Sequence, residues 1–486
     1  MRTTINPAGN RAARRVMISF TLDRTARVRL EVAKTGVRGI ETLDVKTVRP
    51  KHGHRRISWT APAGLTPRTY MLRLRVTDAQ GRTSLYGTDR PGVGKRLAPV
   101  VRVLGVEASF ARRSYGSGER ASLFVEAHAA KLTVEIFHSG SERMRTRRND
   151  VMRGTSVAAP IGAAWKRYRF RRRSIRLPIG DWPSGLYFAR ITTDDRRVGF
   201  APFVVRPRAS DPARVAVVLP THTWQAYNYR DRDGDGWGDT WYAGSTDSIR
   251  LDRPFLNRGV PPRFRLYDLP FLRWLHETGK QVHIYAEDDL ERFPRGDSLR
   301  SAYDLIIFSG HSEYVTTHVY DVIERFRDLG GNLMFLSANS FFWKVRKRGA
   351  RLQRIALWRD TGRPEAALIG VQYLANDDGS IQDGFVVTGA ELTPWAFEGT
   401  GLSNGSVFGQ YGIEIDQTTA DSPPGTMVIA KIPDLFGPGR TAEMTYYETE
   451  AGARVFAAGV LTLGIRALQD DVSQLLENVW KRLTAP

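Results

Sequence analysis

The feature that most constrains the fold is an alternation of apolar strands and amphipathic helices between residues 213 and 338. The run "ARVAVVLP" is apolar and β-branched, as in a strand buried on both faces of a parallel sheet. "DLPFLRWLHETGK" then has helical spacing at Leu269, Leu272 and Leu275, with Gly279 as a stop signal. The segments "QVHIYAEDDL", "YDLIIFSG", "TTHVYDVIERFRDLGG" and "NLMFLSAN" continue the order strand, strand, helix, strand. This order predicts a mainly parallel sheet with crossover helices.

Before this region the sequence is typical of all-β modules. Stretches such as "VMISFTLDRTARVRLEV" and "RASLFVEAHAAKLTVEIFHSG" alternate apolar and polar residues with period two. The Pro/Arg/Ser-rich segment 206–214 indicates a domain boundary. We therefore expect a multidomain chain with two Ig-like β-sandwiches, 1–100 and 101–208, followed by an α/β domain, 209–486. The first module resembles the Ig-like modules of flagellar hook-capping proteins.

Charge is distributed unevenly along the chain. Residues 1–208 contain 43 Lys and Arg against 15 Asp and Glu, a net charge of +28, whereas the remainder has a net charge of −7. Such a positive field favours an anionic cell-surface polymer as a partner; the alternative is a set of solvated arginines on strand faces. No zinc-finger spacing or recognition-helix pattern occurs, which disfavours nucleic acid. The absence of cysteine excludes disulfides, thiolate metal sites and a cysteine nucleophile.

The N-terminus bears on the compartment. "MRTTINPAGNRAARRVMISF" contains basic residues but no apolar stretch of signal-peptide length, and strand-like sequence follows at once. We expect an extracytoplasmic or secreted protein whose signal peptide precedes Met1, with a cytoplasmic protein as the alternative. No run of about 18 apolar residues predicts a transmembrane segment.

The segment "DRDGDGWGDTWY", 231–242, has the pattern of a calcium-binding loop. Oxygen donors at alternate positions can surround one hard cation, and Gly236 permits the sharp turn. The expected ligands are four carboxylates and one backbone carbonyl, from Asp231, Asp233, Asp235, Asp239 and Trp237. Because an EF-hand would end in glutamate where this chain has Tyr242, we expect a shorter, structural calcium loop. A solvated acidic turn is the alternative.

Three polar segments follow predicted strands directly: "PTHTWQAYNY", "SGHSEYVT" and "SANSFFW". The carboxyl ends of neighbouring parallel strands meet at one edge of a sheet, so we expect these segments to converge on one site. A glutamine-amidotransferase-type sheet carries a nucleophilic cysteine at such a turn. Here the turn is Gly310-His311-Ser312-Glu313, so thiol chemistry is excluded.

The motifs "THTWQAYN", "LDRPF", "LPFLRWLHETG", "YDLIIFSGHSEYVT", "GGNLMFLSANSFFW" and "YGIEID" occur in this order. Together they resemble the C-terminal catalytic region of the large (beta) subunit of N,N-dimethylformamidase, over about residues 213–480. The resemblance implies a glutamine-amidotransferase-like sheet and hydrolysis of a C–N bond in a small, formamide-like amide. It also implies one mononuclear, non-haem iron held by two tyrosines and a glutamate.

Carried over by motif, the resemblance assigns Tyr227, Tyr267 and Glu313 as iron ligands, with Tyr242 as an alternative to Tyr267. His311 is expected to transfer a proton, Asn339 to orient the substrate or oxyanion, and Glu414 to assist water. Each side chain also has a purely structural alternative: Glu313 as a helix-dipole partner, Tyr267 as core, Asn339 as a cap.

The resemblance implies a small subunit as partner, and a homo-oligomer is the alternative. Two other functions stay open. One is a non-catalytic surface or adhesion protein that keeps the family sheet. The other is a carbohydrate-active, ThuA-like protein, which an aromatic groove beside Glu313 would favour.

Overall fold

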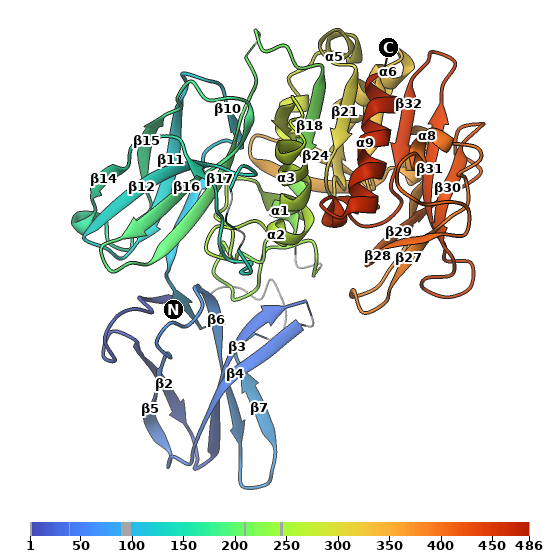
Figure 1. Cartoon of the computed structure of the whole chain (residues 1–486). Helices are drawn as coiled ribbons and strands as arrows, with labels where there is room; N and C mark the ends of the chain where they lie inside the picture. The colour runs from blue at the N-terminus through green and yellow to red at the C-terminus, as the bar shows by residue number, and fades with distance from the viewer. Residues whose placement is uncertain are drawn as a thin grey trace.

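The computed structural model describes residues 2–37, 39–88, 99–142, 144, 146–208, 210–243 and 246–485. It is mostly β, with several sheets and few helices, and is divided into more than one domain (Figure 1). We call β1–β8 the first β unit, β9–β17 the second β unit and β18–α9 the C-terminal region. In Figure 1 the first β unit lies below the other two, which lie side by side.

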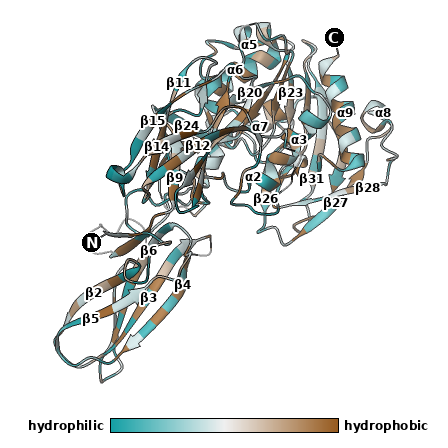
Figure 2. Ribbon diagram, turned by 60° about the vertical axis from the view of Figure 1, so that its left-hand side comes forward, coloured by the Kyte–Doolittle hydropathy of each residue, from teal (hydrophilic) through white to brown (hydrophobic). Residues whose placement is uncertain are grey.

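The first β unit combines a six-stranded sheet, in the order β1-β8-β6-β3-β4 with β7 beside β6, and the hairpin β2-β5. Figure 2 shows its strands banded in teal and brown, as period-two alternation predicts. Trp59 and Tyr70 are buried in its core, and the Tyr70 hydroxyl donates to the Thr66 carbonyl at 2.8 Å. The strands are β1 Arg2–Ile5, β2 Arg15–Leu22, β3 Arg27–Gly36, β4 Gly39–Val48, β5 Gly53–Thr60, β6 Arg68–Thr77, β7 Thr83–Tyr86 and β8 Val100–Val103.

The second β unit packs a six-stranded sheet, β10-β17-β16-β12-β13 with β14 beside β12, against the three-stranded sheet β15-β11-β9. Phe110, Tyr187 and Phe203 meet in its core, where the Tyr187 hydroxyl donates to the Pro183 carbonyl at 2.9 Å. Its elements are β9 Val106–Phe110, β10 Ser114–Tyr115, β11 Arg120–Ala127, β12 Lys131–His138, β13 Thr155–Ser156, β14 Ile161–Ala164, the 3-10 turn Lys166–Tyr168, β15 Arg173–Pro178, β16 Gly185–Thr193 and β17 Val198–Val205.

A nine-stranded sheet forms the centre of the C-terminal region, in the order β20-β18-β21-β23-β32-β31-β30-β27-β28. The first five strands pair in parallel and the other four in antiparallel. The strands are β18 Val215–Leu219, β20 His283–Ala286, β21 Leu305–Phe308, β23 Asn332–Phe335, β27 Gln382–Val387, β28 Val407–Gly412, β30 Met427–Ile432, β31 Ala442–Glu448 and β32 Arg454–Ala457.

Helices cover both faces of the parallel half. Val217 of β18 belongs to the same core as α3 and α9, whereas Val218 belongs to the core formed with α5 and α6. This alternation explains why the strand is apolar at every position. The helices are α1 Thr221–Ala226, α2 Phe264–Tyr267, α3 Leu269–Glu277, α4 Glu287–Leu290, α5 Gly296–Ala302, α6 Thr317–Asp328, α7 Glu365–Ile369, α8 Pro394–Phe397 and α9 Asp470–Thr484.

Two smaller sheets lie beside the carboxyl ends of the parallel strands. One has the order β19-β25-β24-β22 and the other pairs β26 with β29. Their bounds are β19 Ser248–Arg250, β22 Tyr314–Thr316, β24 Trp343–Arg348, β25 Arg351–Leu357, β26 Gln372–Asn376 and β29 Glu414–Gln417, with 3-10 turns at Arg359–Thr361 and Leu463–Arg466. The pair β26-β29 contributes Asn376 and Glu414 to the lining of the largest cavity at this edge.

The structure supports the predicted β-rich, multidomain organisation. Helix α3 ends at Glu277, just before Gly279, whose φ of 67° fits the predicted stop signal. The Ig-like and glutamine-amidotransferase-like assignments, and the boundaries 1–100, 101–208 and 209–486, remain predictions. None of the described helices is long and apolar enough to cross a membrane.

Candidate active site

Polar side chains from four parts of the chain meet at the carboxyl edge of the parallel strands. Tyr227 caps the end of α1, which follows β18 directly. His311 and Glu313 follow β21, and Asn339 follows β23. Strands β18, β21 and β23 are paired in parallel and in order, so their carboxyl ends lie next to one another. Glu414 enters from β29, which lies more than 70 residues farther along the chain.

Tyr227 and Glu313 are in direct contact. The Tyr227 hydroxyl donates a hydrogen bond to Glu313 Oε2 at 2.5 Å. The Tyr314 phenol also lies near this carboxylate, and burial together with the charge of Glu313 raises the pKa of Tyr314 well above its usual value. Residues 86 positions apart thus form one cluster, as the motifs predict.

His311 lies between two carboxylates. Its Nε2 is 3.0 Å from Glu414 Oε2 and 3.6 Å from Glu313 Oε2. The first distance suits an ion pair, but His311 Nε2 and Glu414 Oε2 lack hydrogen-bond geometry and neither has another hydrogen-bond partner in the described chain. A bound molecule can therefore accept a hydrogen bond from the protonated Nε2 and donate one to the carboxylate oxygen.

Asn339 is held by its backbone rather than by its side chain. Its N–H donates to Asp416 Oδ1 at 2.8 Å, and its side-chain Oδ1 is buried without a hydrogen-bond partner in the described residues. The side-chain amide is thus available to a bound molecule. Asp416 lies two residues after Glu414 on β29 and is itself buried.

The cluster opens into a cavity of about 680 Å³. Its lining includes Tyr227, Tyr242, Tyr267, Asp268, His311 and Glu414. Tyr267 and Tyr242, the two candidates for a second tyrosine ligand, therefore both face the same space. The Tyr227 and Tyr242 rings are 5.0 Å apart between centroids. Among the described residues, no hydrogen bond joins Tyr267 or Tyr242 to Glu313, whereas Tyr227 makes one.

Burial dominates the ionisation of the site. It raises the pKa of Glu313 and Tyr227 above their usual values, and that of Asp416 to about 7. Burial raises the pKa of Asp268 to about 8. For His311 burial acts in the opposite direction, but Glu414, Glu313 and Asp416 outweigh it and raise the pKa to about 9. Perturbed groups of this kind gather at functional sites.

Strained backbone also gathers around this cavity. Arg263, Asn339, Ile413 and Thr462 all have positive φ, between 45° and 73°. This conformation is unfavourable for residues with a Cβ, and most of all for β-branched Ile413, which directly precedes Glu414. Such strain persists only where the surrounding structure imposes it, and it is typical of functional sites.

Three further residues of the site were not identified from the sequence: Tyr314, Asp416 and Asp268. Asp416 could have been found, because period two on a strand places it on the same face as Glu414. Asp268 accepts a hydrogen bond from Trp224 Nε1 at 3.2 Å and lies against Gly310, where a Cβ would come within 2.9 Å of its Oδ1. No local signal marks that contact.

A second buried cluster, around His222, contacts the turn that carries Glu313 and Tyr314. His222 Nε2 lies 3.0 Å from Asp288 Oδ1, and its Nδ1 lies 3.1 Å from the Tyr314 carbonyl. Both partners are acceptors, so both ring nitrogens carry a proton and the imidazole is charged. Burial opposes that charge, but Glu287 and Asp288 outweigh it and raise the pKa of His222 to about 9. The neighbouring Thr223 hydroxyl accepts the Glu313 N–H at 3.3 Å.

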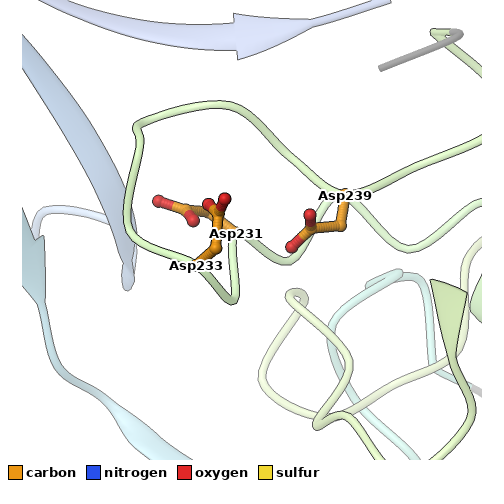
Figure 3. A group of neighbouring side chains, drawn as sticks. All are labelled: Asp231, Asp233 and Asp239. Atoms are coloured by element: carbon orange, nitrogen blue, oxygen red, sulfur yellow. The ribbon is translucent and has the colours of Figure 1, made fainter. Parts of the chain in front are cut away.

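The acidic loop folds into a compact turn beside this site (Figure 3). Carboxylate oxygens of Asp231, Asp233 and Asp239 all lie within 4.8 Å of one another. Asp235 is outside that group, and its Oδ1 accepts the Trp237 N–H at 2.7 Å. In the sequence, Tyr227 precedes the loop and Tyr242 ends it. The loop therefore lies between the tyrosine that contacts Glu313 and a second tyrosine of the cavity lining.

The same loop packs against the first β unit. The Gly238 N–H donates to Thr35 Oγ1 at 3.2 Å, and Trp237 Nε1 donates to Thr88 Oγ1 at 3.3 Å. Gly236 lies so close to Met71 that a Cβ would approach its Cγ to 2.4 Å. The first β unit is thus fixed next to the cavity, and Val37 from its β3–β4 hairpin is part of the cavity lining.

Comparisons with known proteins relate the chain to one family. The N,N-dimethylformamidase beta subunit of Paracoccus aminophilus is 26% identical over 211 residues, which cover 35% of this chain and 27% of that protein. The beta subunit from Alcaligenes sp is 24% identical over 202 residues, which cover 33% and 26%. The aligned part is about a quarter of each relative's length. The mmIFT52 N-terminal domain, a solved structure, is 11% identical with a TM-score of 0.27 over 44% of this chain and 90% of that one, a score too low to carry an argument.

A family model described as N,N-dimethylformamidase beta subunit-like, C-terminal, matches residues 161–465. The match begins inside the second β unit, at β14, and includes every residue of the cluster around Glu313. It covers more than half of the chain and confirms the predicted resemblance. The chain therefore belongs to the N,N-dimethylformamidase beta subunit-like family.

Proposed function

We propose that this protein is a metal-dependent amidohydrolase that cleaves a C–N bond of an amide. The observation that carries the proposal is the buried cluster of Tyr227, His311, Glu313 and Glu414, of which all but Glu313 line a cavity of about 680 Å³. The family membership of the chain supports hydrolase chemistry, since two relatives are named as dimethylformamidase subunits. The alternative of a non-catalytic surface protein does not account for buried polar atoms without partners at this place.

The donor set fits iron, the metal that the resemblance implies. Phenol and carboxylate oxygens are hard donors, as a ferric ion prefers, and Glu313 is approached by Tyr227. We propose Glu313, Tyr227 and either Tyr267 or Tyr242 as the residues that hold the ion. When bound, a ferric ion would polarise an amide carbonyl and lower the pKa of water.

The remaining side chains have roles that follow from their positions. His311 Nε2 faces both Glu414 and the cavity, so it can hold the proton that the leaving amine requires. Glu414 can accept a proton from water, and the unpartnered Asn339 Oδ1 can orient the substrate by accepting a hydrogen bond from an N–H of the amide. The Asp416 carboxylate positions Asn339 through its backbone N–H.

A screen of formamides and longer amides with the purified full chain tests this function. We expect release of amine from at least one class. Tyr227→Phe keeps the ring but removes the hydroxyl that contacts Glu313, so kcat/KM should fall by about 100-fold or more. Tyr168→Phe, in the second β unit, is the matched control and should retain activity. An iron-loaded protein that hydrolyses no amide, or a fully active Tyr227→Phe variant, contradicts the proposal.

We also propose that the acidic loop binds a structural calcium ion through Asp231, Asp233 and Asp239. These are hard oxygen donors at close range, and a cation would relieve the repulsion between the three neighbouring carboxylates. Burial raises the pKa of both Asp231 and Asp239, which is the direction expected for acids brought together without a bound ion.

Calcium should raise the melting temperature of the wild-type protein. At a free calcium concentration one hundred times Kd, linkage gives about 2.7 kcal/mol. Asp233→Ala should remove most of this shift with little other damage, because Asp233 is exposed. Asp247→Ala, an exposed aspartate outside the group, should retain the shift. A wild-type melting curve that does not respond to calcium rules out the site.

The proposal of a protein partner rests only on the names of the two relatives. The two relatives are named beta subunits, so we propose that this chain assembles with a second subunit or with copies of itself. Light scattering of the purified chain, with and without co-expressed partners, measures the mass of the assembly. Binding of the basic β units to an anionic cell-surface polymer remains a prediction from their charge.

A further inference from the structure

The active-site cavity is large for a small neutral amide. Its volume of about 680 Å³ lies in the range of roughly 300–1,000 Å³ that encloses drug-sized ligands. Three members of the cluster around Glu313, namely Tyr227, His311 and Glu414, belong to a lining that also includes Arg263 and Arg466. A substrate that fills this space has a second part, several ångströms away from the bond that is cleaved.

Two arginines on the wall lack carboxylate partners in the described chain. No Asp or Glu oxygen among the described residues lies within 4.0 Å of the guanidinium of Arg263 or Arg466. Arg466 makes one long hydrogen bond, to Gln410 Oε1 at 3.4 Å, and its buried Nε has no partner. A guanidinium left free beside a cavity is suited to bind an anionic group of a ligand.

Arg263 is placed there at a conformational cost. It follows two prolines and has φ 57° and ψ 7°, the left-handed region, at the start of α2. Its charge opposes the effect of burial on the pKa of Tyr267, so the guanidinium lies near that phenol. Strained backbone at a cavity wall is expected where the side chain has a function there.

The charged side chains around the cavity indicate which end of a substrate would lie at the cluster. Acidic side chains gather at the cluster: Glu414 and Asp268 line the cavity, and Glu313 lies 3.6 Å from His311 of the same lining. Arg263 and Arg466 also belong to the lining. Asp377 and Asp378 line the cavity as well, but their carboxylates accept backbone N–H groups, those of Gly379 and Ile381 at 2.9 and 2.8 Å and that of Ser380 at 3.2 Å. An anionic group would be repelled by the acids of the cluster and attracted to the arginines, so the neutral amide would lie at the cluster.

We propose that the substrate is an amide that carries a carboxylate, as in an N-acyl amino acid, and that Arg263 binds this carboxylate with Arg466 as a second donor. This inference rests on the amidohydrolase function proposed above and specifies its substrate class. It distinguishes this chain from an enzyme for small neutral formamides.

The test compares an N-formyl amino acid with its C-terminal carboxamide, and measures release of formate by the full-length protein. The two compounds have the same size and differ in charge. We expect a wild-type kcat/KM ratio of at least about ten in favour of the carboxylate, since hydrogen bonds to charged groups are among the strongest. Arg263→Gln should bring this ratio close to one. Arg265→Gln, which removes a neighbouring arginine outside the cavity lining, should leave it as in the wild type.

A wild-type ratio near one, or an equal loss of preference in Arg263→Gln and Arg265→Gln, overturns the substrate class while leaving the hydrolase function standing. If neither compound is hydrolysed while another amide of the screen is, the substrate class is overturned and the hydrolase function stands. If no amide at all is hydrolysed, the hydrolase function fails, and calorimetric titration with the same two compounds still tests the arginine site. Tighter binding of the carboxylate that is lost in Arg263→Gln then supports it, and equal binding overturns it.

Discussion

Glu313→Gln is expected to lower kcat/KM for amide hydrolysis by about 1,000-fold or more, which is the scale seen when a group central to the chemistry is removed. The substitution keeps the shape of the side chain but removes its charge. Glu313 is 4% exposed and lies at the point where the Tyr227 hydroxyl and His311 meet. A neutral amide there could neither bind a cation nor accept the Tyr227 hydroxyl in the same way.

The matched control for this variant is Glu142→Gln. Glu142 is also a buried glutamate whose pKa is raised by burial, but it lies in the second β unit and accepts the Gly140 N–H. We expect its activity to stay within about threefold of the wild type. Glu313→Gln that keeps more than a tenth of wild-type activity, with an unchanged fold by circular dichroism, would remove Glu313 from the mechanism.

His222→Ala is expected to destabilise the protein by about 3–5 kcal/mol, because it leaves the buried Glu287 carboxylate without its counter-charge. The half-buried Asp288 keeps Lys347 as a partner, at 3.4 Å. His222 is 2% exposed, and its backbone N–H and imidazole contact Glu287 and Asp288. The measurement is the shift of the urea unfolding midpoint near pH 7. His52→Ala, at an exposed histidine, should change stability by less than about 0.5 kcal/mol. A His222→Ala variant as stable as the wild type contradicts this account.

The same histidine predicts how stability depends on pH. Its folded pKa of about 9 is above the unfolded value near 6.5, so its contribution is complete below about pH 6.5 and is lost as pH rises through 9. Wild-type stability should therefore fall between pH 7 and pH 10. His222→Ala should show a weaker fall over this interval in parallel urea titrations. Equal slopes for the two proteins would mean that the imidazole is not charged in the folded state.

The sequence was informative about the fold where its signals are local. Helix α3 and strands β18, β21 and β23 follow from apolar periodicity and from Gly279. The antiparallel half of the nine-stranded sheet was not predicted, because turns and short strands in 363–460 do not specify which strands pair. The contact of the acidic loop with Thr35 and Thr88 depends on more than 140 residues of intervening chain and left no signal.

For the site, motif order identified residues that the fold then brings together. Tyr227, His311, Glu313 and Glu414 are distant in sequence, and parallel pairing of β18 with β21 accounts for most of their convergence. Tyr314 directly follows Glu313 in the segment "SGHSEYVT", and nothing in the sequence distinguishes it from a core tyrosine at the start of a strand. Asp268 matters because it is buried, His222 because both of its ring nitrogens face acceptors, and Arg263 because its backbone has a positive φ. None of these three properties is visible in a single sequence.

The most direct test of the central claim is the metal content of purified full-length protein, measured by elemental analysis with a visible spectrum of the same sample. We expect about one iron per chain, with an absorption band from phenolate bound to ferric ion, and loss of both iron and band in Glu313→Gln. Calcium should remain in that variant, since the acidic loop is separate from Glu313. Protein that folds, is supplied with iron and retains none, or that binds iron equally well without the Glu313 carboxylate, would contradict the account.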